Sequence, residues 1–318
     1  MRSMACFSFH CQTIGALSFS VYVTNPSNGA KGLSTMSEVA YLGGARPARL
    51  RPRRERQTSP GDAAPEATKS ATPATVAGGL ADRFDALDLF ERVATIRSVI
   101  SGRIVFTTSF GLEDQAIAHA IFSQALAIDV ATLDTGRLFP ETHEVWAETE
   151  RRYDRRILAF APEHVSVEAL VARQGIDGLR SSVAARHDCC AIRKIAPLSR
   201  VLGGSAAWVT GIRADQSADR ARFAPASFDE GRQLIKVNPL FDWTRERTLE
   251  FVRAHDVPYN ALHDRGFLSI GCAPCTRAVA PGEPERAGRW WWEQAEKKEC
   301  GLHVAENGAV TRANPPPV

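Results

Sequence analysis

The chain has few cysteines, no long apolar run and little net charge for its length. Its seven cysteines are unevenly placed among 318 residues, which excludes the dense disulfide framework of a small secreted protein. No stretch approaches the roughly 18 uninterrupted apolar residues that a membrane-spanning helix needs. We therefore expect a protein of the reducing cytoplasm that has no membrane segment.

The formal charge of +3 is unevenly distributed along the chain. Residues 1–80 contain nine Lys or Arg and four Asp or Glu, a balance of +5, so the remaining residues carry −2. Nucleic-acid binding draws its affinity largely from basic surface, and a mildly acidic body argues against such a partner. An anionic ligand must instead be met by locally clustered arginines.

Residues 1–80 differ in composition from the rest of the chain. The segment 46–56 holds six arginines, and 58–79 is rich in Ala, Pro, Thr and Gly. Such a segment cannot bury enough apolar surface to offset the entropy of ordering, so we expect it to be disordered. Its basic first 60 residues match a transit peptide superficially, but an extension upstream of a true start at Met36 is the preferred interpretation. Cys6 and Cys11 lie in this segment, and we assign them no role.

From about Leu80 onward, strand and helix patterns alternate. The predicted strands are 103–110, 126–133, 156–161, 207–212 and 234–237, and the predicted helices are 112–125, 140–153, 166–173 and 244–256. This alternation predicts an α/β fold over residues 81–270, with a doubly wound, mostly parallel sheet covered on both faces. A C-terminal segment, 271–318, follows. Ligands of such sheets bind beyond the carboxyl ends of the strands.

Two polar motifs follow predicted strands. Thr108–Asp114 opens a helix, where free backbone N–H groups suit a phosphate and Gly111 permits close approach. An ordinary strand–helix turn, with Ser109 as the helix cap, explains this motif about equally well. Leu133–Arg137 offers polar contacts to a ribose or base and the charge of Arg137. For this motif alone, a solvated turn is an equally good explanation.

Four cysteines form two close pairs, Cys189-Cys190 and Cys272-x-x-Cys275. Four thiolates are a full ligand set for an iron–sulfur cluster or a zinc ion. Tetrahedral zinc draws its sulfurs to about 3.8 Å from one another. Adjacent side chains near a predicted helix over 192–201 diverge by about 100°, which suits the wider separation, about 6 Å, of ligands on two irons of a cubane. The residues favour a cluster but leave zinc open.

Cys300 is the remaining thiol, in the basic segment Lys297–His303. A predicted helix over 289–299 would end beside it, with Gly301 as its cap. The negative end of that helix would raise the pKa of the thiol, and the neighbouring Lys and His side chains would lower it. A buried structural cysteine is the alternative. Because the surrounding residues are polar, we expect a free nucleophile in a mobile C-terminal tail.

With these motifs, three further segments resemble the family of phosphoadenylyl- and adenylyl-sulfate reductases over about residues 100–304. The segments are Gly211–Ser217 (GIRADQS), Arg286–Trp292 (RAGRWWW) and Glu299–His303 (ECGLH). The family belongs to the adenine-nucleotide alpha-hydrolase-like proteins, which carry a pyrophosphatase-type (PP) loop. ATP-cleaving relatives have a Ser-Gly-Gly-x-Asp-Ser loop, from which Phe110, Leu112 and Glu113 depart. This departure argues against adenylating chemistry.

The resemblance implies thioredoxin-dependent reduction of adenosine 5′-phosphosulfate (APS) to sulfite and AMP in sulfate assimilation. It implies a [4Fe-4S] cluster held by Cys189, Cys190, Cys272 and Cys275. Cys300 would attack the sulfate sulfur and form an S-sulfocysteine, from which a thiol of reduced thioredoxin, or glutaredoxin, would release sulfite. No thioredoxin-like domain follows Cys300, so we expect a separate reductant protein, and the family implies a homo-oligomer.

The resemblance also implies which residues contact the sulfonucleotide. They are Ser109, Phe110, Gly111, Glu113, Asp114, Leu133, Asp134, Thr135, Gly136, Arg137, Lys194, Gly211, Arg213, Arg220, Arg286, Arg289 and His303. Lys194 would lie between cluster and substrate, and with three arginines it would stabilise charge on the sulfonyl oxygens. Two alternatives remain. One is a reductase of 3′-phosphoadenosine 5′-phosphosulfate (PAPS) that releases adenosine 3′,5′-bisphosphate, although such enzymes generally lack the quartet. The other is a zinc-stabilised nucleotide-binding module without reductase activity.

Overall fold

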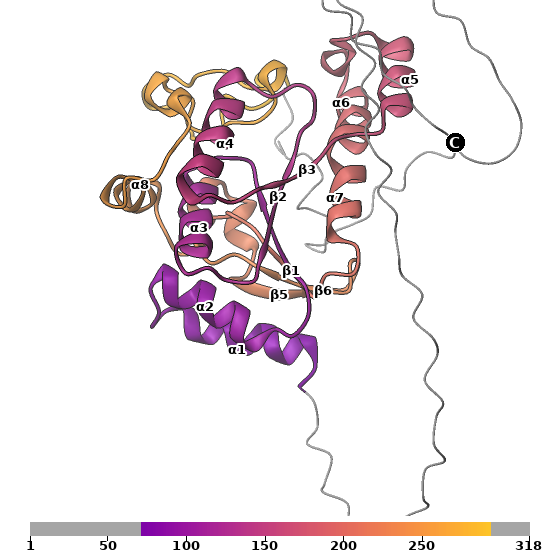
Figure 1. The fold of residues 1–318 in the computed structure, drawn as a ribbon. Helices are drawn as coiled ribbons and strands as arrows, with labels where there is room; N and C mark the ends of the chain where they lie inside the picture. Colours follow the sequence, from indigo (N-terminus) through magenta and orange to yellow (C-terminus); the bar gives the residue numbers. More distant parts are fainter. Residues whose placement is uncertain (1–70, 294–318) are drawn as a thin grey trace, which may run out of the picture. The chain divides into compact units, whose positions relative to one another are not determined.

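The computed structural model describes residues 71–293, which are built around a six-stranded sheet (Figure 1). The strands are β1 Ile104–Thr108, β2 Asp129–Leu133, β3 Leu158–Phe160, β4 Ala207–Val209, β5 Ala226–Asp229 and β6 Leu234–Val237. Their order is β3-β2-β1-β4-β6-β5, and every neighbouring pair is parallel except β5 and β6. The predicted doubly wound, mostly parallel α/β fold is therefore confirmed.

Helices cover both faces of the sheet. They are α1 Pro73–Phe84, α2 Leu89–Val99, α3 Leu112–Ser123, α4 Pro140–Tyr153, α5 His164–Gln174, α6 Val183–Cys190, α7 Ala196–Leu202 and α8 Arg245–Ala254. The larger core joins α1, α2, α3 and α8 to strand residues such as Phe106 and Val209. A smaller core packs Leu198 and Val201 of α7 against Val105 on the opposite face. Figure 1 shows α7 across the sheet from α3 and α8.

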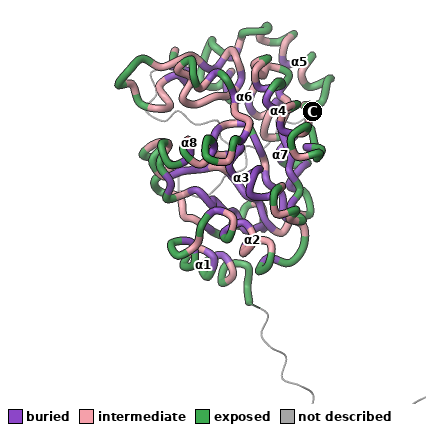
Figure 2. The backbone as a smooth tube through the Cα atoms, turned by 60° about the vertical axis from the view of Figure 1, so that its left-hand side comes forward, coloured by how far each residue is buried: buried purple, intermediate pink, exposed green. Residues whose placement is uncertain are grey.

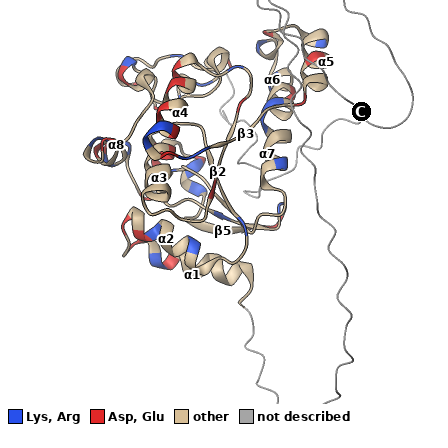
Figure 3. Cartoon of the chain, viewed as in Figure 1, with Lys and Arg blue, Asp and Glu red and all other residues tan. Residues whose placement is uncertain are grey.

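Burial and charge follow this layered arrangement. Figure 2 shows buried positions concentrated inside the described part, with exposed positions on its outer turns. Figure 3 shows acidic and basic residues interspersed along the outer helices. Within residues 71–293, none of the helices is both long enough and apolar enough to cross a membrane.

Helix α1 corrects the predicted boundary at residue 80. It begins at Pro73, inside the segment expected to be disordered. Thr72 caps it by accepting a backbone hydrogen bond through its side chain, and proline suits the first turn. Leu80 and Phe84 are buried in the larger core. This burial offsets the cost of ordering the segment, which composition alone does not reveal.

The edge strand β5 was not predicted from the sequence. It has four residues and pairs antiparallel with β6, whose bounds Leu234–Val237 are the predicted ones. The chain reverses between the two strands at Gln233, which has a left-handed backbone with φ of 55°. Four residues are too few for a distinct pattern of alternation.

A continuous helical run carries the first cysteine pair. Helix α6 ends at Cys190, a π-helical turn spans Ala191–Ile195, and α7 follows at once. The run therefore begins earlier than the helix predicted over 192–201. A π turn inserts one extra residue into a helix and is frequent at functional sites.

The C-terminal segment is irregular as far as Glu293. A helix predicted over 289–299 is absent from its described part, 289–293. There, Arg289 forms an isolated β-bridge with Thr276, and Trp290 has a φ of 44°. A left-handed residue cannot continue an α-helix. Cys300 and His303 lie outside the described residues, as does segment 1–70.

Candidate active site

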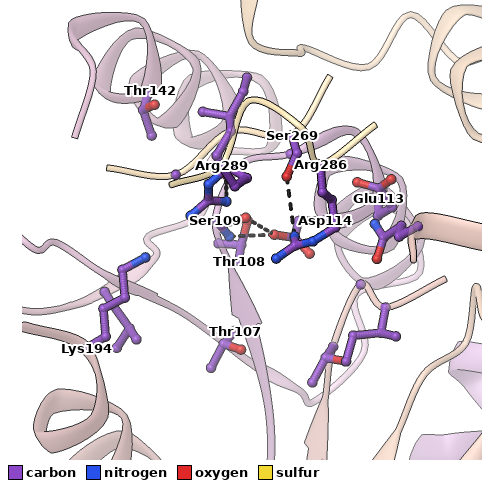
Figure 4. Close-up of a pocket in the computed structure, with 18 of the residues that line it drawn as sticks. Thr107, Thr108, Ser109, Glu113, Asp114, Thr142, Lys194, Ser269, Arg286 and Arg289 are labelled. Carbon is purple, nitrogen blue, oxygen red and sulfur yellow. Dashed lines mark hydrogen bonds between the residues drawn. The ribbon is translucent and has the colours of Figure 1, made fainter. Parts of the chain in front are cut away.

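A cavity of about 200 Å³ lies at the carboxyl ends of the central strands (Figure 4). The loops after β1, β2 and β4 form one side, and the C-terminal segment forms the other. Of the residues predicted to contact substrate, those lining it are Ser109, Gly111, Glu113, Asp114, Leu133, Thr135, Lys194, Gly211, Arg220, Arg286 and Arg289. The topology thus brings together residues from five segments that are distant in the sequence.

The loop after β1 is organised by Asp114. Its Oδ2 atom accepts hydrogen bonds from the backbone N–H of Ser109 at 2.5 Å and from the Ser109 hydroxyl at 2.7 Å. Ser109 is therefore not the helix cap. The N-cap of α3 is Gly111, which has no side chain to bond the first amides. Burial raises the pKa of Asp114 to about 6.

Close approach requires glycine at Gly211 and not at Gly111. A Cβ at Gly211 would lie 2.3 Å from Oδ1 of Asp114, a severe overlap. The exit of β4 therefore passes directly against the start of α3. Gly111 has a φ of −72°, and a Cβ there would make an ordinary contact of 3.4 Å with Glu113.

Arg213 connects two walls of the cavity without lining it. Its side chain is fully buried, donating to Glu113 at 2.7 Å and to Glu285 at 2.8 Å, and it also pairs with Asp215. Burial raises the pKa of Glu285, and the charge of Glu113 adds to this effect. Although burial opposes ionisation of Glu113, Arg213 holds its pKa below the ordinary value. The predicted ligand contact is therefore a buried ionic junction.

Phe110, another predicted contact, belongs to the larger core. It is 1% exposed, and its ring stacks on Trp146 with 5.6 Å between centroids. Its backbone is left-handed, with a φ of 60°, which reverses the chain direction just before α3. The side chain therefore anchors the loop after β1 to the larger core.

Three predicted contacts in the loop after β2 also lie outside the cavity. Oδ1 of Asp134 accepts the backbone N–H of Gly136 at 2.9 Å, closing a local turn. Arg137 pairs with Asp177 at 2.8 Å and lines a second cavity. Only Leu133 and Thr135 of this motif face the first cavity. The solvated-turn interpretation thus fits Asp134 and Gly136 but not the other three residues of the motif.

Four cysteines converge in the second, smaller cavity. Cys189, Cys190, Cys272 and Cys275 line this cavity and form one apolar cluster with Trp290. Over residues 71–293, no three His, Cys, Asp or Glu side chains close around a single point as ligands of one metal ion. The four cysteines thus line one cavity, as the sequence suggested.

The two cavities share a wall formed by Lys194, Arg289 and Trp290. Burial opposes ionisation of Cys272, but Lys194 and a 3.2 Å hydrogen bond with Thr135 hold its pKa below the ordinary value. Burial raises the pKa of Cys275 to about 11. Positive charge on the shared wall therefore acts on both cavities.

Three residues that line the cysteine cavity or pack against its cysteines have buried N–H groups without acceptors. They are Nε of Arg289 and Nε1 of Trp290 and Trp292. The Trp290 ring also lies under the guanidinium groups of Arg186 and Arg289, at 4.6 and 4.7 Å from its centroid. Buried donors normally have partners, and a sulfide-containing cluster offers acceptor atoms to such donors. The donor set fits an iron–sulfur group.

Sequence reasoning missed several cavity residues in the loop before the second cysteine pair. His263, Ser269 and Gly271 line the cavity, as does Thr142 of α4. A Cβ at Gly271 would lie 2.3 Å from the Arg289 guanidinium, so this glycine makes room for that side chain. The position of the segment directly before Cys272 was the only available signal.

A mostly parallel sheet that carries a cavity at its carboxyl ends, next to a cysteine-lined cavity, defines an α/β protein with two adjoining sites. Residues 103–278 match the model of the phosphoadenosine phosphosulfate reductase domain, and the chain belongs to this family. The expected family is thereby confirmed.

Two similar proteins are named adenosine 5′-phosphosulfate reductase. That of Rhizobium meliloti (strain 1021) is 53% identical over 225 residues, which are 71% of this chain and 84% of that protein. That of Allochromatium vinosum is 51% identical over 203 residues, 64% of this chain and 79% of that protein. A phosphoadenylyl-sulfate (PAPS) reductase structure from Candida auris, a phosphate complex, has a TM-score of 0.56 at 24% identity. It covers 67% of this chain and 100% of that chain, and it shows the fold.

Proposed function

We propose that this chain reduces APS to sulfite and AMP in sulfate assimilation. The observation that carries the proposal is the wall shared by the two cavities, where Lys194 and Arg289 face both. An anionic sulfonucleotide in the first cavity would place its charge beside these cations. The names of the similar reductases support the same reaction.

Cys300 is the proposed nucleophile. Its thiolate attacks the sulfate sulfur, an S–S bond forms, and the S–O bond breaks as AMP leaves with the electron pair. A thiolate of a dithiol protein then attacks Sγ of Cys300, and sulfite leaves with the electron pair of the S–S bond. The second thiol resolves the mixed disulfide, so the donor dithiol supplies both electrons.

The cavity residues have separate tasks in this reaction. The uncapped amides at the start of α3 suit a phosphate group. Lys194, Arg220, Arg286 and Arg289 line the cavity and stabilise charge that develops on the phosphosulfate oxygens.

The cysteine quartet would hold a [4Fe-4S] cluster. When bound, the cluster would supply a fixed charge distribution next to the shared wall. The reaction requires no electron transfer from it. Lys194 lies in the shared wall and orients the sulfonate against this field. The fit rests on four converging thiols and three buried N–H groups without acceptors.

The nucleophile is tested by mixing purified enzyme with APS while withholding reductant. Mass spectrometry should find one added SO₃ on the peptide that contains Cys300. Cys300→Ser should form no adduct and release no sulfite, whereas a matched Cys11→Ser variant should behave as wild type. Turnover by Cys300→Ser would remove this residue from the mechanism.

The cofactor is tested by elemental analysis after anaerobic purification. We expect about four iron and four sulfide per chain, and Cys272→Ser should lose iron. A full iron complement in that variant would refute the ligand assignment. A colourless protein with one zinc per chain would support the nucleotide-binding module instead.

Substrate and donor are tested together by steady-state kinetics. APS should be preferred over PAPS, with thioredoxin or glutaredoxin as the dithiol donor. A higher kcat/KM for PAPS would reassign the substrate. We further expect a cytoplasmic homo-oligomer, which light scattering and cell fractionation would check.

A further inference from the structure

His263 presents an unpaired acceptor within the first cavity. Its imidazole lines that cavity, yet its Nε2 atom is buried and has no hydrogen-bond partner. Its Nδ1 atom lies 2.8 Å from the carbonyl oxygen of Phe267. Because a carbonyl oxygen only accepts, Nδ1 must carry the proton of this bond.

The tautomer of His263 follows from this bond. Burial, reinforced by the charge of Arg245, lowers the pKa of His263 to about 4, so the ring is neutral near pH 7. A neutral imidazole protonated on Nδ1 exposes a bare lone pair on Nε2. A buried acceptor without a donor is costly. The unpaired lone pair of Nε2 can therefore accept a hydrogen bond from a molecule bound in this cavity.

The buried atoms without hydrogen-bond partners are donors on one side of the first cavity and an acceptor on another. Over residues 71–293, three cavity-lining residues have a buried side-chain atom without a partner. Arg289 and Trp290, on the wall shared with the cysteines, contribute donors. His263 contributes the acceptor, and its charged neighbours include Glu113. The cavity thus offers donors beside the cysteines and an acceptor near the Glu113–Arg213–Glu285 junction.

We propose that Nε2 of His263 accepts a hydrogen bond from the nucleoside part of the ligand, either a ribose hydroxyl or the 6-amino group of adenine. Ionised phosphate and sulfate oxygens only accept, so they cannot serve this atom. The proposal deepens the proposed function and rests on its nucleotide cavity. His263 is thereby a specificity-determining residue that also orients the sulfonate end toward Lys194 and Arg289.

The test compares AMP with analogues that each lack one donor. Isothermal titration of the full-length holoenzyme would use AMP, 2′-deoxy-AMP, 3′-deoxy-AMP and purine riboside 5′-monophosphate, which lacks the amino group. Wild type should bind one analogue about 10–100-fold more weakly than AMP, because that analogue leaves Nε2 unpaired. The analogue affected identifies the donor.

A variant then assigns the discrimination to His263. His263→Phe should weaken AMP by a similar factor and bind AMP and that analogue within about twofold, while the other ratios stay unchanged. His143→Gln is the matched control, because His143 is an exposed histidine of α4 outside the cavity. It should retain every wild-type ratio.

Three outcomes overturn the inference. The first is that wild type binds all analogues within twofold of AMP, a result that does not depend on the folding of any variant. His263→Phe could keep the wild-type ratios, which would assign the recognition elsewhere. Failure of wild type to bind AMP would overturn both this inference and the proposed function. Discrimination as expected, without sulfite release from APS, would overturn the reductase activity alone.

Discussion

Arg213 donates to both carboxylate oxygens of Glu285, at 3.1 and 2.8 Å. This fork holds the segment just before Arg286 against the junction with Glu113. Arg213→Met would leave the two carboxylates buried and unpaired, at a cost of about 3–5 kcal/mol in the free energy of unfolding. Urea unfolding measures this loss, and the variant should also bind AMP more weakly.

A double variant separates charge from packing at this junction. Arg213→Met with Glu285→Gln should recover part of the lost stability, since it removes one of the stranded charges. The exposed pair of Arg103 and Asp129 is the control, and Asp129→Asn should cost no more than about 1 kcal/mol. Equal losses in the free energy of unfolding for the buried and the exposed pair would contradict a stabilising role of the Glu113–Arg213–Glu285 junction.

Asp114 makes stability depend on pH. Its folded-state pKa of about 6 exceeds the ordinary 3.8, so the folded chain binds this proton more tightly than the unfolded chain. Its contribution is complete below the unfolded pKa and is lost as pH rises through 6. The free energy of unfolding of Asp114→Asn, relative to that of wild type, should therefore increase by about 1 kcal/mol between pH 5 and pH 7. Urea unfolding at both pH values checks this, and a pH-independent difference would refute it.

Lys194 should affect the reaction more than nucleotide binding. It lies in the wall next to the cysteines, so its charge would act mainly on the sulfonate. We expect Lys194→Gln to lower kcat/KM for APS by about 10²–10³-fold, with full iron content and AMP affinity within about threefold of wild type. Lys194→Arg should lose less. An equal loss in AMP affinity would show that Lys194 binds the nucleotide and not the sulfonate.

Helix α1 should be required for stability. Phe84 is 2% exposed and lies in the larger core. Phe84→Ala should cost about 3–5 kcal/mol in the free energy of unfolding. The exposed Asp82 of the same helix is the control, and Asp82→Ala should stay within about 0.5 kcal/mol. Similar values for both would show that α1 is dispensable.

More of the fold than of the site could be predicted from the sequence. Hydrophobic periodicity indicates which residues are buried, but it does not indicate which side chains interact. Buried strands such as β6 were identified with their bounds, since apolar runs of that length have few other uses. The ion pairs of Arg213 join residues up to 100 positions apart, and no local pattern encodes such a contact. Phe110 turns inward because of its backbone conformation, which a motif match does not convey.

The cysteine quartet and His263 show the same contrast between what sequence patterns predict and what tertiary contacts determine. Spacing indicated that four thiols act together, and the structure places them in one cavity. The acceptor role of His263 depends on a bond to Phe267 and on burial of one ring atom. Both are properties of tertiary packing, which no local sequence pattern encodes.

The π-helical turn over Ala191–Ile195 fixes a phase relation along the run from α6 to α7. Deleting one residue there would twist α7 by about 100° relative to α6. Either Leu198 and Val201 would then lose their contacts with the sheet, or the cysteines of α6 would leave the second cavity. We therefore expect the packing of α7 to tolerate substitutions in this stretch better than an insertion or a deletion. The length of the stretch is thus a structural constraint in addition to the chemical role of Lys194.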